Sequence, residues 1–347
     1  MLNKNCMLEI KRTTSEYIRG IAIVAVVLEH ILGGGFGVLG GGFGVISGHL
    51  ASIFGIGGVT IFLLLSGYGL YQSYCKNGLQ GKTFWDKKMQ KVFIPYAVIT
   101  VVFYLYMMVR GDAPAYPALL KNILCIDYAR TMDSTMWYMS FQLIWYAAFF
   151  CVFYFNGPRI GKLALLMLLG LCFSGYWLKG TFLDCAWQFA MNAFAFPLGV
   201  GLGYVTDLFN RAPICEKRKG LICMLIRIVV FAGSLTVLIL AICKVIQISY
   251  WKWGLVLFFV LYTLLSLPKR EIKILKWLGK NSFMIYLVEG KLISVFALLP
   301  ALKENVALYL LCYAVAVVAV VYLYRFGTFL FDRVRRYLEE KYSGFQI

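Results

Sequence analysis

Two ionisable side chains bracket an apolar segment near the start of the chain, RGIAIVAVVLEH at residues 19–30. Arg19 opens the segment and His30 closes it, and eleven helical steps bring both side chains to one face, about 16 Å apart along the axis. An imidazole exchanges protons near neutral pH, and polar groups deep in apolar helices usually mark a path or a site. The spacing therefore predicts a functional histidine; a hydrogen-bonded packing histidine is the alternative.

The two other charged residues of this segment, Arg19 and Glu29, also have interpretations that involve no chemistry. Arg19 lies where a positive residue often anchors a helix at the cytoplasmic surface. Glu29 is rotated by about 100° from His30 on the same helix, so we expect it to face another helix or the outer interface.

A second carboxylate lies in the apolar segment WLGKNSFMIYLVEGK, residues 277–291. Glu289 comes about two helical turns after a capping residue, Asn281 or Ser282. A carboxylate at that depth is costly unless it has a partner or a proton. The sequence therefore predicts that Glu289 pairs inside the bundle, with either Lys291 or His30.

The composition assigns the chain to the membrane class. Of its 347 residues, 61% are hydrophobic and 14% are charged, and the mean hydropathy is +0.77; soluble domains are more polar. The net charge of +18 does not indicate nucleic-acid binding, because Lys and Arg lie in short clusters between apolar runs. The ten cysteines are scattered without the spacing of a zinc site, so no metal is predicted.

The apolar runs predict an all-α, polytopic membrane bundle of about ten spans, since a ~30 Å crossing needs about 20 mostly apolar residues. Gly175 and Glu289 interrupt the fifth and ninth runs. The predicted spans are residues 17–34, 52–73, 92–109, 137–155, 161–178, 187–207, 221–243, 252–267, 282–299 and 306–326.

The loops predict the orientation. Dense clusters of Lys and Arg precede the first span and follow the second, sixth, eighth and tenth, whereas the first loop has none. Positive residues stay on the cytoplasmic side, so both termini are expected there. The predicted organisation is a cytoplasmic tail at 1–16, a ten-span domain at 17–328 and a second tail at 329–347.

Two connections carry further expectations. The glycine-rich segment GGGFGVLGGGFG, residues 33–44, predicts a flexible outer loop, and nearby His49 is expected to take no part in chemistry. The longest gap, residues 110–136, has room for one amphipathic piece at most.

Several stretches together resemble acyltransferase family 3, the bacterial inner-membrane O-acyltransferases that modify surface glycans. YIRGIAIVAVVLEH has the family's R-x10-H spacing, and GGVTIFLLLSGYGL is similar to its phenylalanine-rich segment ending in Ser-Gly-Phe. FWDKKMQKVFIPY resembles Arg-x-x-Arg-x-x-x-Pro, and WLGKNSFMIYLVEGK resembles Gly-x-x-Ser-x-x-x-Tyr-Leu-x-His. MWYMSFQLIWY, ahead of the fourth span, is similar to the Leu-Trp-Phe segment.

Three charged positions depart from the family pattern. Lys88 and Lys91 stand where the family has its two arginines, which keeps positive charge but loses the bidentate fork of a guanidinium. Glu289 replaces the late histidine.

The resemblance implies transfer of an acyl group, usually acetyl, from cytoplasmic acyl-CoA to a hydroxyl of an extracytoplasmic or lipid-linked saccharide. His30 is then the general base, and Glu289 is assigned beside it as a catalytic residue. Arg19, Lys88 and Lys91 are assigned to the CoA side. Ser66 and Gly67 are assigned to substrate binding, with helix packing as the alternative.

The family also implies a multi-pass protein of the bacterial plasma membrane, with lipids, acyl-CoA and a glycan as its partners and no permanently bound cofactor. The competing function is a proton-coupled transporter or flippase in which His30 and Glu289 form a relay; a membrane receptor or scaffold is a third. The acceptor glycan, the acyl group and the oligomeric state stay open.

Overall fold

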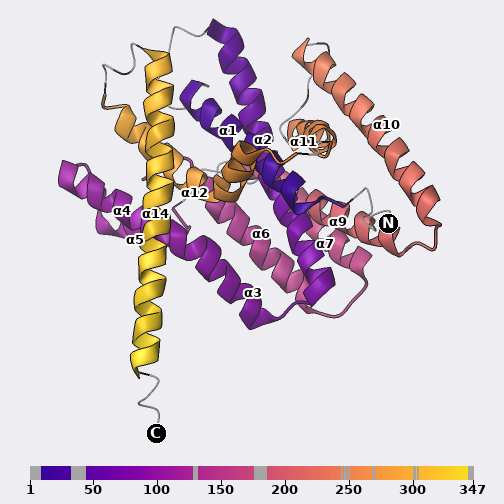
Figure 1. Ribbon diagram of the computed structural model, residues 1–347, viewed down its shortest axis with the longest axis horizontal. Helices are drawn as coiled ribbons and strands as arrows, with labels where there is room; N and C mark the ends of the chain where they lie inside the picture. The colour runs from indigo at the N-terminus through magenta and orange to yellow at the C-terminus, as the bar shows by residue number, and fades with distance from the viewer. Residues whose placement is uncertain are drawn as a thin grey trace.

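The computed structural model describes residues 9–32, 44–127, 132–175, 186–243, 245, 248, 251–267, 270–299, 302 and 305–342. Every regular element in these residues is a helix (Figure 1), so the predicted all-α fold class is confirmed. In chain order they are α1 (Arg12–Leu32), α2 (Gly44–Asn77), α3 (Gly81–Lys88), the π-helix η1 (Met89–Phe93), α4 (Ile94–Arg110), α5 (Tyr116–Ile123), α6 (Trp137–Tyr154), α7 (Arg159–Ser174), α8 (Ala186–Asn192), α9 (Ala195–Arg211), α10 (Glu216–Ile242), α11 (Trp251–Leu265), α12 (Lys273–Phe296) and α14 (Val306–Tyr342).

Each predicted span overlaps at least one helix, with 187–207 divided between α8 and α9, and six helical segments are long and apolar enough to cross a membrane. Those six are Gly55–Asn77, Gly81–Arg110, Trp137–Tyr154, Trp187–Arg211, Arg218–Ile242 and Val306–Tyr337. The other four predicted spans fall on α7 and α11, which are shorter, and on α1 and α12, which carry more charge. The protein is therefore a helical membrane protein, while the count of ten spans and the orientation stay predictions.

Helices α1, α2 and α12 form the centre of the bundle (Figure 1). Gly20 of α1 and Gly279 of α12 face each other's helix so closely that a Cβ at either position would collide with the backbone carbonyl of Leu275 or Glu16. Small residues at helix crossings let backbones approach in lipid. This crossing brings the segment that carries His30 beside the segment that carries Glu289.

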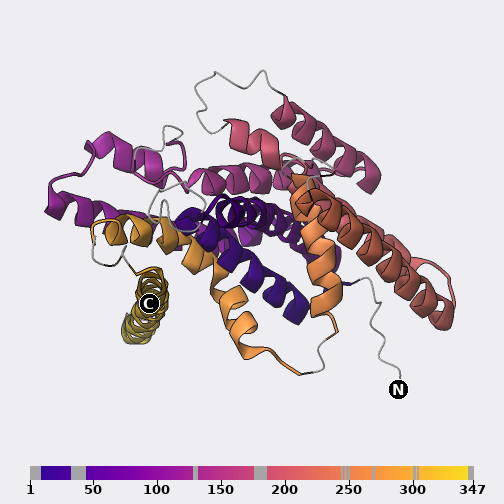
Figure 2. The same cartoon turned by 90° about the horizontal axis from the view of Figure 1, so that it is seen from above.

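Two helices lie at the edges. In both views α10 and α14 lie on opposite sides of the bundle (Figures 1 and 2), and both expose rows of large apolar side chains, as lipid-facing helices do. Helix α14 continues to Tyr342, past the predicted boundary at residue 329, because the residues after Gly327 include good helix formers and no proline.

One of the remaining sequence expectations can be compared with the structure, and the others concern residues that it does not describe. The short helix α5 occupies part of the 110–136 gap, as expected. The glycine-rich residues 33–43, the side chain of His49 and the ends of both predicted tails lie outside the described residues.

Candidate active site

The segment that carries Lys88 and Lys91 changes its helical pitch. Lys88 ends α3, Lys91 lies in the π-helix η1, and α4 follows with Pro95 in its first turn. Proline has no N–H to donate to the carbonyl four residues earlier, here that of Lys91, and its ring crowds the preceding turn. A π turn relieves this conflict, and such turns are frequent at functional sites. The widened turn places Lys91 beside α2 and α6.

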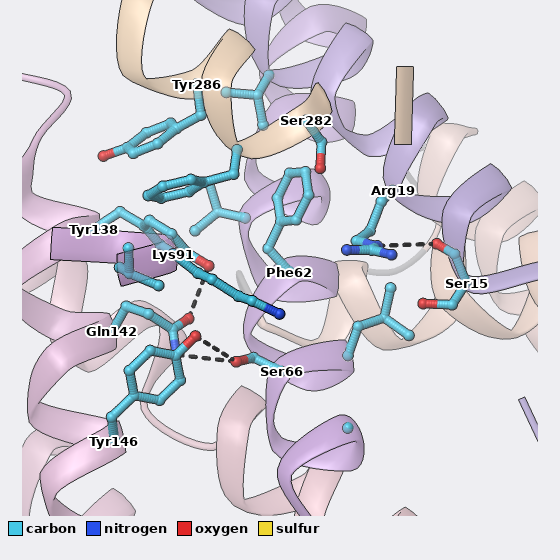
Figure 3. Close-up of a pocket in the computed structure, with 16 residues that line it drawn as sticks. Ser15, Arg19, Phe62, Ser66, Lys91, Tyr138, Gln142, Tyr146, Ser282 and Tyr286 are labelled. Atoms are coloured by element: carbon cyan, nitrogen blue, oxygen red, sulfur yellow. Dashed lines mark hydrogen bonds between the residues drawn. The ribbon is translucent and has the colours of Figure 1, made fainter. Parts of the chain in front are cut away.

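A cavity of about 390 Å³ opens where α1, α2, η1, α6 and α12 meet; we name it the Arg19 cavity (Figure 3). The guanidinium of Arg19 and the ammonium of Lys91 both point into it, and Ser66 lines the same space. The Nε of Arg19 donates to the carbonyl of Ser15 at 3.4 Å. The other lining residues are Ser15, Val26, Val59, Phe62, Leu65, Gly69, Val92, Tyr138, Gln142, Tyr146, Ser282, Phe283 and Tyr286.

A polar stripe on α6 forms one wall of the Arg19 cavity (Figure 3). Tyr138 donates to the side-chain oxygen of Gln142 at 2.8 Å. The amide nitrogen of Gln142 donates to the Ser66 hydroxyl at 3.1 Å, and Ser66 donates to the hydroxyl of Tyr146 at 3.2 Å. The chain of hydrogen bonds fixes Ser66 and leaves a mixed polar and aromatic surface.

Lys88 lies next to this wall but lines a different cavity. Its ammonium sits 3.7 Å from the ring centroid of Tyr146, a cation–π contact. Together with Lys87 and Lys91 it lines a cavity of about 250 Å³, the Lys88 cavity. Lys91 lines both the Lys88 cavity and the Arg19 cavity. Lys88, Lys91 and Arg19 therefore form a continuous row of positive side chains along the two cavities.

A third cavity, of about 380 Å³, lies further along α1; we name it the His30 cavity. It shares Val26, Val59, Tyr138 and Tyr286 with the Arg19 cavity, so those four residues form the wall between the two. The other lining residues are Glu29, His30, Gly55, Ile56, Ser134, Thr135, Trp137, Trp187, Gln188, Met191 and Asn192.

Glu289 pairs with His30. The Nδ1 of His30 lies 2.8 Å from Oε1 of Glu289, and the Glu289 side chain is 0% exposed. The hydroxyl of Tyr313 donates to the Glu289 carbonyl at 3.1 Å and ties down the backbone behind it. The other carboxylate oxygen, Oε2, has no hydrogen-bond partner among the described residues, so the imidazole is the main compensation for a carboxylate buried in a membrane helix.

Lys291, the other predicted partner of Glu289, is occupied elsewhere. Its ammonium donates to Oδ2 of Asp133 at 2.8 Å, and both side chains are buried. Thr135 donates to Oδ1 of Asp133 from its N–H at 2.8 Å and from its hydroxyl at 2.6 Å. Burial raises the pKa of Asp133, but the Lys291 ammonium and the Thr135 hydrogen bonds outweigh burial and hold that pKa below its ordinary value.

The ion pair fixes the segment before α6 against α12. Tyr286 adds a hydrogen bond from its hydroxyl to the carbonyl of Thr135 at 2.7 Å. Ser134 and Thr135 line the His30 cavity, so the Asp133–Lys291 pair holds one wall of that cavity.

Glu29 contacts the histidine as well. Its Oε2 lies 3.3 Å from Nε2 of His30, although adjacent residues of a helix project about 100° apart. It also faces α2, as expected: a Cβ at Gly55 would collide with the Glu29 side chain. Glycine at position 55 leaves the space in which Glu29 folds back toward the ring.

The structure brings most of the predicted site residues together. Arg19, Lys91 and Ser66 share the Arg19 cavity, Lys88 adjoins it, and His30 pairs with Glu289 next door. Gly67 does not line these cavities. A Cβ there would collide with the Phe196 carbonyl of α9, so helix packing requires the glycine, and its role in substrate binding stays a prediction.

Sequence reasoning missed three features of the site. Tyr138, Gln142 and Tyr146 recur at i, i+4 and i+8 on α6, and that polar stripe in an apolar run was a usable signal. The contact of Glu29 with its neighbour and the Asp133–Lys291 pair depend on tertiary packing and had no comparable signal.

The comparison with protein families covers all of these residues. Residues 13–325 match the model of acyltransferase family 3, described as an acyltransferase domain. No curated protein and no solved structure matches the chain. The match extends over most of the 347 residues, from the first turn of α1 to the middle of α14. The chain therefore belongs to acyltransferase family 3 and is a membrane acyltransferase.

Proposed function

We propose that this protein transfers an acyl group, normally acetyl, from cytoplasmic acyl-CoA to a hydroxyl of an extracytoplasmic or lipid-linked saccharide in the bacterial plasma membrane. The observation that carries the proposal is the adjacency of two cavities, one lined by cations and one by a histidine whose ring pairs with the buried Glu289 carboxylate. A donor with a charged carrier at one end and a reactive thioester at the other fits that arrangement.

The carrier end of the donor binds on the cationic side. Lys88, Lys91 and Arg19 supply positive charge for the phosphates of CoA, and hydrogen bonds between ionised partners are about twice as strong as neutral ones. The Arg19 cavity then takes the pantetheine arm, whose amides match the polar stripe of Tyr138, Gln142 and Ser66. The thioester reaches the wall formed by Val26, Val59 and Tyr138.

His30 acts as the general base. A carboxylate only accepts hydrogen bonds, so the proton between His30 and ionised Glu289 lies on Nδ1. This fixes Nε2 as the nitrogen that takes the proton of the acceptor hydroxyl. The hydroxyl oxygen attacks the thioester carbonyl, and Glu289 stabilises the imidazolium that forms, as an acid does beside other catalytic histidines.

The lining of the His30 cavity supports a saccharide acceptor. Trp137 and Trp187 offer aromatic faces, and Gln188 lines the same cavity with a polar side chain. Sugar rings have apolar faces and hydroxyl-bearing edges, and pockets that combine apolar walls with a few placed polar groups recognise such ligands.

The proton-relay alternative uses the same His30–Glu289 pair, and one experiment separates the two functions. The protein is reconstituted with acetyl-CoA carrying a labelled acetyl group and with membranes of the source organism, which contain the acceptor. Acyl transfer releases free CoA and fixes the label in a saccharide fraction, and both require His30. A transporter would move protons without releasing CoA, and a receptor would do neither.

A further inference from the structure

We infer that Glu29 is a second catalytic group, the general acid that protonates the departing thiolate while His30 serves as the base. The inference rests on the proposed acyl transfer and adds a residue to it.

The two carboxylates that contact His30 hold it with unequal strength. Glu289 meets Nδ1 at 2.8 Å and is 0% exposed, whereas Glu29 meets Nε2 at 3.3 Å and its side chain is 23% exposed. Charge-assisted N–H···O bonds are normally about 2.7–2.9 Å, so the Glu29 contact is long. An acceptor hydroxyl that reaches Nε2 displaces Glu29 and leaves Glu289 in place.

We assign one proton to the contact between Glu29 and Nε2, because the two groups form an ion pair only when the ring is protonated. This proton lies either on the nitrogen, giving imidazolium and carboxylate, or on the oxygen, giving neutral imidazole and carboxylic acid. Both forms contain the same number of protons. When Glu29 leaves the ring with this proton, it becomes an acid and His30 becomes a neutral base in one movement.

The position of Glu29 suits the leaving group. Glu29 follows Val26 by one helical turn, and Val26 belongs to the wall that the His30 cavity shares with the Arg19 cavity. A thioester that enters from the Arg19 cavity brings its sulfur to this wall. The Cβ and Cγ of Glu29 pack against the backbone of Gly55, while Glu29 and His30 both line the His30 cavity, which leaves room for the carboxylate to turn away from the ring.

The proton balance closes without any other reactant. The acceptor hydroxyl gives its proton to Nε2 of His30, its oxygen forms a bond to the thioester carbon, and the bond between that carbon and sulfur breaks. Protonated Glu29 gives its proton to the sulfur, and free CoA leaves as a thiol. His30 is then imidazolium and Glu29 is ionised, so the pair has returned to its starting protonation state.

Donors with different leaving groups test the assignment. An aromatic thiolate is far more stable than the alkyl thiolate of CoA and needs no acid. We compare kcat/KM for acetyl-CoA and for S-acetyl-4-nitrothiophenol in membranes of the source organism that lack the native gene and express the parent or a variant. Each rate is corrected for membranes that express His30→Ala.

Glu29→Gln should lower kcat/KM for acetyl-CoA by about 10²-fold or more, the effect of lost acid catalysis, and by less than about threefold for the nitrothiophenyl donor. Glu289→Gln, which weakens the base, should slow both donors by the same factor. Glu29→Asp keeps an acid and should retain part of the acetyl-CoA rate. Asp207→Asn is the matched control on α9, where Asp207 pairs with Arg159 at 2.6 Å; it should leave both rates unchanged.

If Glu29→Gln lowered kcat/KM by the same factor for both donors, the inference would be overturned and Glu29 would have a structural role. A parental kcat/KM for acetyl-CoA in Glu29→Gln would also overturn it. A Glu29→Gln protein that misfolds would lose both activities together with its monodisperse peak in detergent, and Glu29→Asp then decides by its ratio of rates between the donors. If the parent itself transfers no acetyl group from acetyl-CoA, the proposed function fails first.

Discussion

The Arg19 cavity and the His30 cavity share a wall but are lined by opposite charges. Arg19 and Lys91 line the first, and none of its described lining residues is acidic. Glu29 lines the second beside His30, with Glu289 directly behind the ring, and none of its described lining residues is a lysine or an arginine.

The two cavities also compensate their charges differently. Arg19 and Lys91 remain partly or largely exposed, so water and ligand phosphates can solvate them, which limits the cost of the charge. Glu289 is fully enclosed and depends on one imidazole. We therefore propose that the first cavity supplies binding affinity and the second supplies proton transfer. Changes in the first should therefore alter KM, and changes in the second should alter kcat.

The largest effect should come from His30→Ala. Removing the base that the acceptor hydroxyl needs should lower kcat by about 10²–10⁴-fold, with little change in the donor KM. Initial rates of CoA release at several acetyl-CoA concentrations measure both constants. Near-normal yield in the membrane is the control, and activity within a few-fold of the parent would exclude His30 as the base.

The second effect concerns the wall of the His30 cavity. Asp133→Asn leaves the Lys291 ammonium buried without its counter-ion, and breaking a buried pair costs about 3–5 kcal/mol. The melting temperature in detergent should fall clearly at pH 7. Replacing both partners, as Asp133→Asn with Lys291→Met, should recover part of the loss, since no unpaired charge remains.

The same ion pair predicts a pH dependence. The fold holds the pKa of Asp133 below its ordinary value, so ionised Asp133 stabilises the fold at pH values above the ordinary carboxyl range, about 4. That contribution is lost as the pH falls from about 4 through the lowered folded-state value. The difference in melting temperature between the parent and Asp133→Asn should therefore shrink on the acid side. A difference that stays constant from pH 7 to pH 3 would contradict it.

The sequence predicted the helices well because the length of an apolar run is a local property. The motifs also selected Arg19, His30, Ser66, Lys88, Lys91 and Glu289, which lie in or beside the three cavities, while their roles stay predictions. The sequence left the partner of Glu289 open between two residues because His30 lies 259 positions away, and spacing along the chain carries no information about which helices cross. The glycine pair between α1 and α12 settles that crossing.

Other parts of the site depend on local geometry that a periodic pattern hides. A regular helix over Lys88–Pro95 would place both lysines on one face, but around the π turn both lysines line the Lys88 cavity and only Lys91 also reaches the Arg19 cavity. Glu29 was expected to point away from His30, and its side chain folds back because Gly55 provides room. Neither result follows from residue spacing.

The fourth prediction tests the cationic side of the site. An ammonium paired with a phosphate at a partly wet surface contributes about 1–2 kcal/mol, so replacing Lys88 and Lys91 together with Gln should raise the KM for acetyl-CoA by roughly tenfold or more. The kcat should stay near the parental value. Replacing both with Arg restores the charge and should restore the donor KM. An unchanged KM in the Gln variant would place the phosphates of CoA elsewhere.

The smallest effect should come from Ser66→Ala, which separates direct contact with the donor from packing. Ser66 accepts from Gln142 at 3.1 Å and donates to Tyr146 at 3.2 Å, and a lost hydrogen bond of this kind costs about 1 kcal/mol, or about fivefold in KM. If Ser66 acts only by positioning Gln142, the change should have no further effect in a Gln142→Leu background, since coupled residues are not additive. If Ser66 contacts the donor itself, the fivefold loss should persist there. Donor KM values for the parent, the two single variants and the double variant measure the coupling. Full additivity would indicate that Ser66 contacts the donor directly and does not act by positioning Gln142.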